Sequence, residues 1–291
     1  MFNSSNNFRG FNIIAAFLLI VVLTACNEEA REPANTSDST STTSSNEKET
    51  TEAGGESDNG VEIPAIQLPE GSDMATADMI GLIVYQGNIY TQTNTEISPE
   101  DAKELVGEKL GRTTGTIDEW SEQEDYEKEF ASSTGVGDVF AVKGYEPSFR
   151  IMMYGDDHAE FYEHLNGITV ASGEDVFGKM NMTGNVVSAE YQFYSDWYQS
   201  RGNKKPIGDE EVVNTFVEDL NETKPLVRSE SNDPIGDLRS DETHKKLYLT
   251  LEDGSRVQLT LLEGGYIYYG YGGVYFQMDE AQFSDMWELL E

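Results

Sequence analysis

Residues 246–264 read KLYLTLEDGSRVQLTLLEG, and this stretch decides the fold of the C-terminal part of the chain. Leucine or valine occupies every second position on both sides of Asp253-Gly254. Alternation with a period of two is typical of a strand with one buried face, and Asp-Gly between two such runs predicts a β-hairpin. We therefore expect two antiparallel strands whose leucines pack against the rest of the protein.

The flanking segments extend this hairpin into a small α+β domain. Residues 264–278, GGYIYYGYGGVYFQM, predict two more short strands separated by Gly272-Gly273. Apolar side chains recur at helical spacing in residues 208–220 and again in residues 278–291, where Asp279 begins a predicted capping box. The order of helix, four strands of an antiparallel meander and helix predicts a sheet with helices packed on one face.

The region from about residue 75 to 200 predicts a second antiparallel sheet with helices. Residues 79–93, MIGLIVYQGNIYTQT, predict a hairpin through Gln86-Gly87-Asn88, and Ser98-Pro99 predicts the start of a helix. The runs DVFAVKG, SFRIMMY and EFYEHLNGITV predict a meander. Basic, glycine and proline residues gather in QSRGNKKPIG, so the predicted fold is α+β in two small domains, at residues 71–203 and 204–291.

The first 70 residues predict a leader and a tether. Residues 1–25 carry one charge before an apolar run that is shorter than the about 20 residues of a membrane span, so they predict a signal peptide. Residues 27–60 contain no aromatic residue and no valine, isoleucine, leucine or methionine, so we expect them to be disordered. Residues 26–70 then form an acidic Ser/Thr-rich tether, in which residues 61–70 either stiffen the chain through two prolines or add an edge strand.

The motif Leu23-Thr24-Ala25-Cys26 ends the apolar run and resembles the lipobox of bacterial lipoprotein precursors. The resemblance implies that a diacylglycerol, with acyl chains such as palmitate, is joined to Cys26 and holds the protein on the outer face of the cytoplasmic membrane. Two acyl chains give stable attachment where one chain binds marginally. Cys26 is the only cysteine, so the folded part has no disulfide. Residues 140–157, FAVKGYEPSFRIMMYGDD, resemble segments of uncharacterised lipoproteins of Bacillus-type bacteria, which implies a Gram-positive envelope and no particular activity.

The charge balance limits the class of partner. The chain has 19 Lys plus Arg against 54 Asp plus Glu, a formal net charge of −35 at pH 7. Nucleic acid is excluded as a partner because phosphate binding depends on cationic side chains, and anionic lipid headgroups are also repelled. The excess of acid serves solubility, or it attracts a basic partner such as a cationic peptide or a lysine-rich face of another envelope protein. We expect a monomer.

Catalytic and metal-binding motifs are weak in this sequence. His158 and His164 stand six residues apart among four acidic residues, a spacing that fits neither helical ligand pairs nor a zinc motif. Ser148, His164 and a carboxylate supply the residue types of a catalytic triad, but the sequence has no nucleophile elbow. The acidic loop 231–237, SNDPIGD, predicts an Asx turn or weak calcium binding. We predict no catalytic residue, no metal ligand and no cofactor.

The most distinctive candidate surface is the tyrosine-rich segment 266–276, YIYYGYGGVYF. In strand alternation Tyr266 and Tyr268 face one way, while Tyr269 and Tyr271 face the other way with Ile267. These four tyrosines are the predicted binding residues, because a tyrosine row can dock a glycan strand or an extended peptide; the alternative is ordinary sheet composition. The sequence therefore predicts a non-catalytic protein- or peptide-binding module of the cell envelope. The alternatives are a wall-polymer hydrolase with paired carboxylates and a weak cation- or solute-binding lipoprotein.

Overall fold

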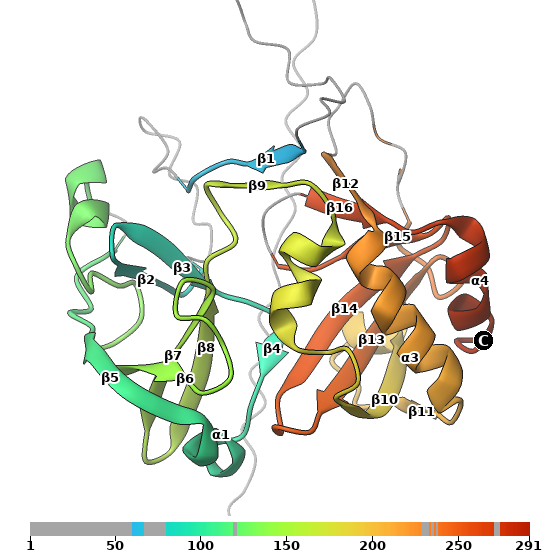
Figure 1. The fold of residues 1–291 in the computed structure, drawn as a ribbon, viewed down its shortest axis with the longest axis horizontal. Helices are drawn as coiled ribbons and strands as arrows, with labels where there is room; N and C mark the ends of the chain where they lie inside the picture. Colours follow the sequence, from blue (N-terminus) through green and yellow to red (C-terminus); the bar gives the residue numbers. More distant parts are fainter. Residues whose placement is uncertain are drawn as a thin grey trace, which may run out of the picture. The chain divides into compact units, whose positions relative to one another are not determined.

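The fold is known from a computed structural model that describes residues 60–66, 80–118, 121–227, 233, 236, 238–270 and 274–291. Every strand pair described is antiparallel, and four short α-helices accompany the sheets, so the predicted α+β class is confirmed (Figure 1). The predicted signal peptide, Cys26 and most of the predicted tether lie outside the described residues.

The larger sheet contains the hairpin predicted from residues 246–264. Its neighbours run in the order β11-β10-β13-β14-β15-β16-β12, and β4 pairs with the beginning of β14. The predicted four-strand meander β13 to β16 is confirmed, and β12 continues the sheet beyond β16. The strands of this sheet are β4 (Thr95–Glu96), β10 (Val186–Phe193), β11 (Lys205–Ile207), β12 (Lys224–Val227), β13 (His244–Leu251), β14 (Arg256–Leu262), β15 (Tyr266–Tyr268) and β16 (Val274–Gln277).

The smaller sheet is built from the N-terminal segments, in the order β2-β3-β8-β7-β6-β5. The predicted hairpin is confirmed, because β2 pairs with β3. The predicted meander is also confirmed, because β6 pairs with β7 and β7 pairs with β8. The strands are β2 (Leu82–Tyr85), β3 (Asn88–Gln92), β5 (Val106–Arg112), β6 (Asp138–Val142), β7 (Arg150–Gly155) and β8 (His158–Glu163). A separate pair joins β1 (Val61–Ile63) to β9 (Ile168–Val170), so the first residues of segment 61–70 add a strand.

The helices begin where the sequence places capping residues. Ser98, Asp209 and Asp279 cap three of them, and each side-chain oxygen accepts a hydrogen bond from a backbone N–H of the first turn. The α-helices are α1 (Pro99–Leu105), α2 (Tyr194–Tyr198), α3 (Glu210–Asp219) and α4 (Glu280–Glu288). Four short 3-10 helices lie between strands: η1 (Gln123–Glu127), η2 (Gly173–Asp175), η3 (Phe177–Met180) and η4 (Leu220–Glu222).

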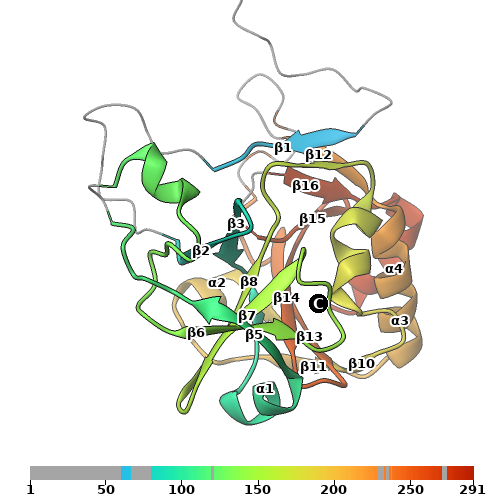
Figure 2. The same ribbon diagram turned by 60° about the vertical axis from the view of Figure 1, so that its left-hand side comes forward.

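The main hydrophobic core is shared by both sheets. Met152 and Phe161 of the smaller sheet belong to the same buried cluster as the alternating leucines of β13 and β14. Apolar side chains of α3 and α4 complete this cluster, and Figure 2 shows both helices on one side of β13 and β14. The large sheet therefore has an inner face, on which its leucines meet the core, and an outer face on the other side.

The predicted boundary between residues 203 and 204 falls within the larger sheet. Strand β10 comes before the boundary and β11 follows it, yet the two strands pair with each other, and β10 also pairs with β13. The described residues belong to one compact unit of the chain. Whether residues 71–203 and 204–291 fold independently stays a prediction.

The turn between β2 and β3 depends on one glycine. Gln86 and Gly87 form a two-residue connection with φ of +51° and +75°, the positive values that a type I′ hairpin turn requires. A side chain with a Cβ atom tolerates this region poorly, whereas glycine enters it freely. A Cβ on Gly87 would meet no atom within 4 Å, so its effect would be purely conformational.

Replacement of Gly87 by alanine is expected to lower the free energy of unfolding by about 1 kcal/mol. Gly155→Ala is the matched control, because a Cβ there also meets nothing within 4 Å and its φ lies outside the left-handed region. Urea unfolding of the two variants beside the parent chain measures the difference. Equal stability of the two variants would contradict this account of the turn.

Candidate functional site

The strand register assigns a defined set of side chains to the outer face of the large sheet. Leu247, Leu249 and Leu251 face the core, so the residues between them on β13 point the other way. Directly paired residues share a face in an antiparallel sheet, which extends the assignment from strand to strand. One row across the sheet is Gln192, Lys246, Thr260, Tyr268 and Tyr275, and a second is His244, Leu262, Tyr266 and Gln277.

The structure divides the four predicted binding tyrosines. Tyr266 and Tyr268 are half-buried on the outer face, while Ile267 between them is buried, so the predicted alternation holds over β15. The ring of Tyr268 lies 4.8 Å from that of Tyr275 on the neighbouring strand. Tyr269 is only 4% exposed and belongs to the core, and Tyr271 lies outside the described residues. The outer face therefore presents Tyr266, Tyr268 and also Tyr275.

Helix α2 covers one end of the outer face with aromatic side chains. The Trp197 ring lies 4.0 Å from Nζ of Lys246, which places this helix over β13 on the side away from α3 and α4. Tyr194 lies near both Trp197 and Tyr198, at ring distances of 6.0 and 5.6 Å. Tyr198 is 70% exposed and Trp197 is 38% exposed, so the helix presents aromatic surface to solvent.

Cationic side chains accompany these rings. Lys204 Nζ lies 4.2 Å from the centre of the Tyr248 ring, and the Arg256 guanidinium lies 4.6 Å from it. The Tyr248 hydroxyl donates to Oε1 of Gln192 at 2.8 Å, which fixes the ring on the sheet. Cations over aromatic faces are favourable contacts of about 0.5–2 kcal/mol each. This end of the outer face therefore combines aromatic surface with positive charge in a chain that is strongly acidic.

Burial lowers the pKa of two titratable groups at this end of the outer face. Lys246 is 6% exposed and donates to Oγ1 of Thr260 at 2.7 Å, and burial lowers the pKa of its ammonium to about 8. Burial, together with the charge of Lys246, lowers the pKa of His244 to about 4, so its imidazole is neutral at pH 7. Nδ1 of His244 lies 3.2 Å from the carbonyl oxygen of Leu238, which makes Nδ1 the protonated nitrogen.

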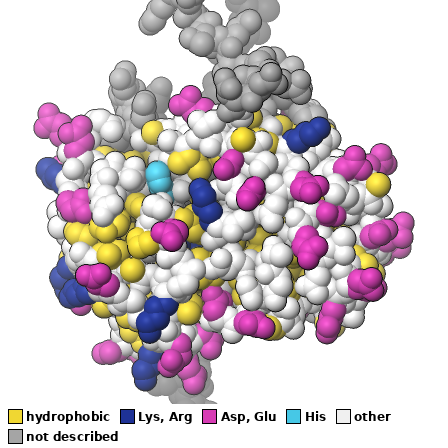
Figure 3. All heavy atoms as spheres, in the orientation of Figure 1, with side chains coloured by type: hydrophobic (Ala, Val, Ile, Leu, Met, Phe, Trp, Pro, Cys, Tyr) yellow, Lys and Arg dark blue, Asp and Glu magenta, His cyan; other side chains and the backbone are white. Residues whose placement is uncertain are grey.

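Many acidic side chains lie on the side of the large sheet that carries α3 and α4. Figure 3 shows them distributed over the side of the molecule that carries α3 and α4. Helix α3 contributes Glu210, Glu211, Glu218 and Asp219. Since α3 and α4 pack on the inner face, the acids of these helices and the lysines beside α2 lie on opposite sides of the large sheet.

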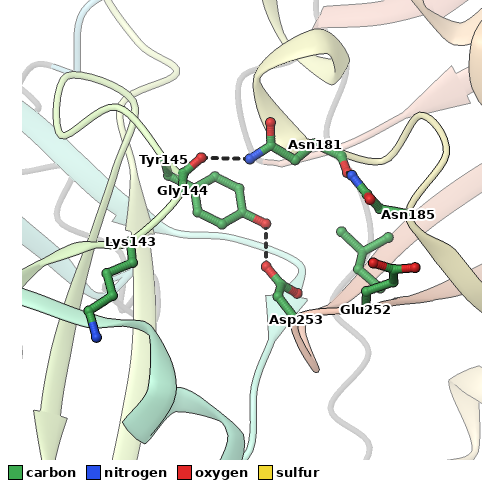
Figure 4. Close-up of a pocket in the computed structure, with 8 residues that line it drawn as sticks. Lys143, Gly144, Tyr145, Asn181, Asn185, Glu252 and Asp253 are labelled. Atoms are coloured by element: carbon green, nitrogen blue, oxygen red, sulfur yellow. Dashed lines mark hydrogen bonds between the residues drawn. The ribbon is translucent and has the colours of Figure 1, made fainter.

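A cavity of about 220 Å³ lies apart from the outer face (Figure 4). Lys143, Gly144, Tyr145, Asn181, Asn185, Leu251, Glu252 and Asp253 line it. The Tyr145 hydroxyl donates to Oδ2 of Asp253 at 2.7 Å, and Asn181 donates to the carbonyl oxygen of Gly144. The cavity is smaller than the ~300–1,000 Å³ of typical ligand pockets. Its polar groups bond to one another, so the outer face is the stronger candidate.

The histidines considered from the sequence have structural surroundings. The His164 imidazole packs 5.4 Å from the Tyr90 ring and bonds with backbone groups of Ser148 and Asn166, and burial lowers its pKa. His158 lies 3.5 Å from Glu160 at the start of β8. Across the described ranges, no three His, Cys, Asp or Glu side chains come close enough to hold a metal ion.

A buried ion pair within the smaller sheet is joined to the larger sheet by Tyr269, and it was not predicted from the sequence. Arg150 on β7 and Glu163 on β8 are both fully buried, with Nε of the arginine 2.9 Å from Oε1 of the glutamate. Tyr269, at the end of β15, donates its hydroxyl to Oε2 of Glu163 at 2.6 Å. The same hydroxyl lies 2.6 Å from Oγ1 of Thr95 and 2.9 Å from Oγ1 of Thr93.

Aromatic rings surround the guanidinium of this pair. The Arg150 guanidinium carbon lies 4.3 Å from the centre of the Tyr145 ring and 4.8 Å from that of Phe161. Burial alone would lower the pKa of Arg150, but Glu163, Tyr269 and Tyr145 together outweigh this effect and the pKa is raised. Burial, with the charge of Glu163, also raises the pKa of Tyr269. Tyr269 therefore has a structural position, as a neutral donor to a buried carboxylate.

Removal of the Tyr269 hydroxyl is expected to lower the free energy of unfolding by about 1–3 kcal/mol, because a buried oxygen of Glu163 loses its donor. Tyr266→Phe, at a half-buried tyrosine of β15, is the matched control and is expected to unfold with the parent chain. Urea unfolding of Tyr269→Phe and Tyr266→Phe measures both effects. A Tyr269→Phe variant as stable as the parent would contradict the assigned role.

In the part of the chain that the structure describes, no helix has the length and apolar character that crossing a membrane requires. Comparison with protein families, with curated proteins and with solved structures gives no match for this chain. We therefore infer function from the geometry of the outer face and from the sequence motifs.

Proposed function

We propose that this chain is a lipoprotein of the Gram-positive cell envelope, anchored through a diacylglycerol on Cys26 to the outer face of the cytoplasmic membrane. In this proposal the folded part is a non-catalytic module that binds another envelope protein or a peptide. The observation that carries the binding role is the row of aromatic side chains on the outer face of the large sheet. Tyr266, Tyr268 and Tyr275 are half-buried there, so the sheet holds their rings while part of the surface of each stays exposed.

The physical properties of tyrosine support this role. A tyrosine ring buries a large area and loses little side-chain entropy, which is why tyrosine and tryptophan dominate the binding energy of many interfaces. Rings on paired strands are also preorganised, since the ladder of β14, β15 and β16 fixes their spacing before the partner arrives. A tether would let such a face search the space near the membrane.

The binding role predicts that Tyr266→Ala with Tyr268→Ala abolishes capture of a partner. The full chain, retained in native membranes, is crosslinked to its neighbours, and the captured proteins are identified by mass spectrometry. Phe140→Ala with Tyr154→Ala is the matched control, because these half-buried rings pack 6.3 Å apart on the smaller sheet. Loss of one protein in the tyrosine variant alone is the expected result. Equal capture by both variants would exclude the tyrosines from the interface.

The anchor predicts that Cys26→Ser releases the chain from the membrane. The thioether to diacylglycerol requires the cysteine sulfur, so the serine variant is expected to lose both the lipid and stable attachment. Metabolic labelling with an alkyne analogue of palmitate in a Gram-positive host measures lipidation, and membrane fractionation measures attachment. Ser44→Ala, within the predicted tether, is the control. Labelled lipid on the Cys26→Ser variant would contradict the lipobox assignment.

A further inference from the structure

We propose that the end of the outer face formed by Trp197, Tyr198, Lys204, Lys246 and Tyr248, here termed the α2 corner, binds an acidic peptide segment of the partner. This inference rests on the proposed function and adds the chemical class of the segment that is bound. It is carried by two lysines without a carboxylate partner and by exposed aromatic surface beside them.

Lys246 is the first of these lysines. Its side chain is 94% buried, and its Nζ contacts Oγ1 of Thr260 and the face of Trp197. No carboxylate among the described residues forms an ion pair with it. A buried ammonium is costly unless an opposite charge compensates it, and most buried charges in proteins are paired. An acidic segment bound outside Trp197 would supply compensating negative charge without touching Lys246.

Lys204 is the second lysine, and it differs from the two arginines near it because those arginines form ion pairs. Arg256 is paired with Glu190 at 2.6 Å, and Arg201 is paired with Asp196 at 3.1 Å, so the charges of both arginines are already balanced. Lys204 is half-buried beside the Tyr248 ring and takes part in no ion pair with a described carboxylate. Its ammonium can reach a partner without first breaking an ion pair.

The exposed rings of α2 provide the apolar part of the interface. Trp197 shields Lys246, while Tyr198 projects into solvent with 70% of its surface exposed. A glutamate-containing segment that lies along α2 would bury these rings and bring carboxylates to Lys204. The field of Lys246 would act through the low-dielectric interior, where screening by salt is weak.

The test measures binding of fluorescently labelled peptides to the full chain, solubilised from membranes in detergent at about 0.15 M salt, where distant charges are screened. The probe is a short peptide of alternating glutamate and glycine. Versions with glutamine or lysine in place of glutamate show whether negative charge is required. Inorganic polyphosphate tests whether any polyanion is sufficient.

The variants Lys204→Gln and Lys246→Met are each expected to weaken binding of the acidic peptide about tenfold. Lys245→Met is the matched control for the buried lysine, because Lys245 is 5% exposed on the opposite face of β13. Lys103→Gln, at an exposed lysine on α1, is the control for Lys204. Thermal unfolding confirms that each variant is folded. Lys246→Met is expected to be no less stable than the parent, since it removes an unpaired buried charge.

Equal binding of the glutamine and glutamate peptides, or stronger binding of the lysine peptide, would overturn the inference. Tighter binding of polyphosphate than of the acidic peptide would also overturn it, since charge alone would then suffice. These results are separable from the proposed function, which is tested by capture through Tyr266 and Tyr268. If the parent chain does not bind the acidic peptide, while partner capture persists in Lys204→Gln and Lys246→Met, the proposed function stands. The α2 corner is then not a site for an acidic segment.

Discussion

The hydrogen bond from Tyr269 to the buried ion pair of Arg150 and Glu163 is the constraint on which the alignment of the two sheets depends. Both side chains are fully buried, so the pair has lost its hydration and must be satisfied by protein groups. Tyr269, from the larger sheet, supplies a hydrogen bond to the carboxylate, and Tyr145 and Phe161 cover the guanidinium. Sliding one sheet over the other would break the hydrogen bond from Tyr269 and leave its hydroxyl and an oxygen of Glu163 without that partner in the core. An apolar core tolerates such slippage more readily, so the hydrogen bond to the pair favours one alignment of the sheets.

This alignment determines which surface is left for binding. The inner face of the large sheet is occupied by the shared core and by α3 and α4. The outer face carries the tyrosines of β15 and β16, and α2 crosses one end of it. The same strand alternation that buries Ile267 therefore turns Tyr266 and Tyr268 outward. The alternation of apolar and polar residues therefore accounts for both the buried core and the exposed tyrosines, and the ion pair lies on the core side of the sheet.

Local signals in the sequence predicted the local elements, and contacts between distant segments account for the differences. Asp253-Gly254 and Gln86-Gly87 defined two hairpins, since a turn and its flanking alternation lie within a few residues. The partnership of β10 with β13 joins strands more than fifty residues apart, and no turn signal encodes it. Segment 199–208 was predicted to be an exposed interdomain connection, and most of its residues are exposed, but it also contains β11, which pairs with β10, and Lys204, which lies beside Tyr248. Its basic composition reflected a position beside aromatic rings.

The ion pair between Arg150 and Glu163 could have been predicted from the sequence. Asp156-Asp157 is a two-residue turn, and counting back from it pairs Gly155 with His158 and Arg150 with Glu163. Opposite charges at paired positions of two largely apolar strands are a signal for a buried ion pair.

By contrast, the net charge of −35 says little about the α2 corner. The screening length is about 8 Å at physiological salt, so acids on the far side of the sheet contribute weakly there. Lys204 and Lys246 instead add positive charge without an ion-pair partner at the α2 corner, so a strongly acidic protein can carry a binding site for an acidic segment.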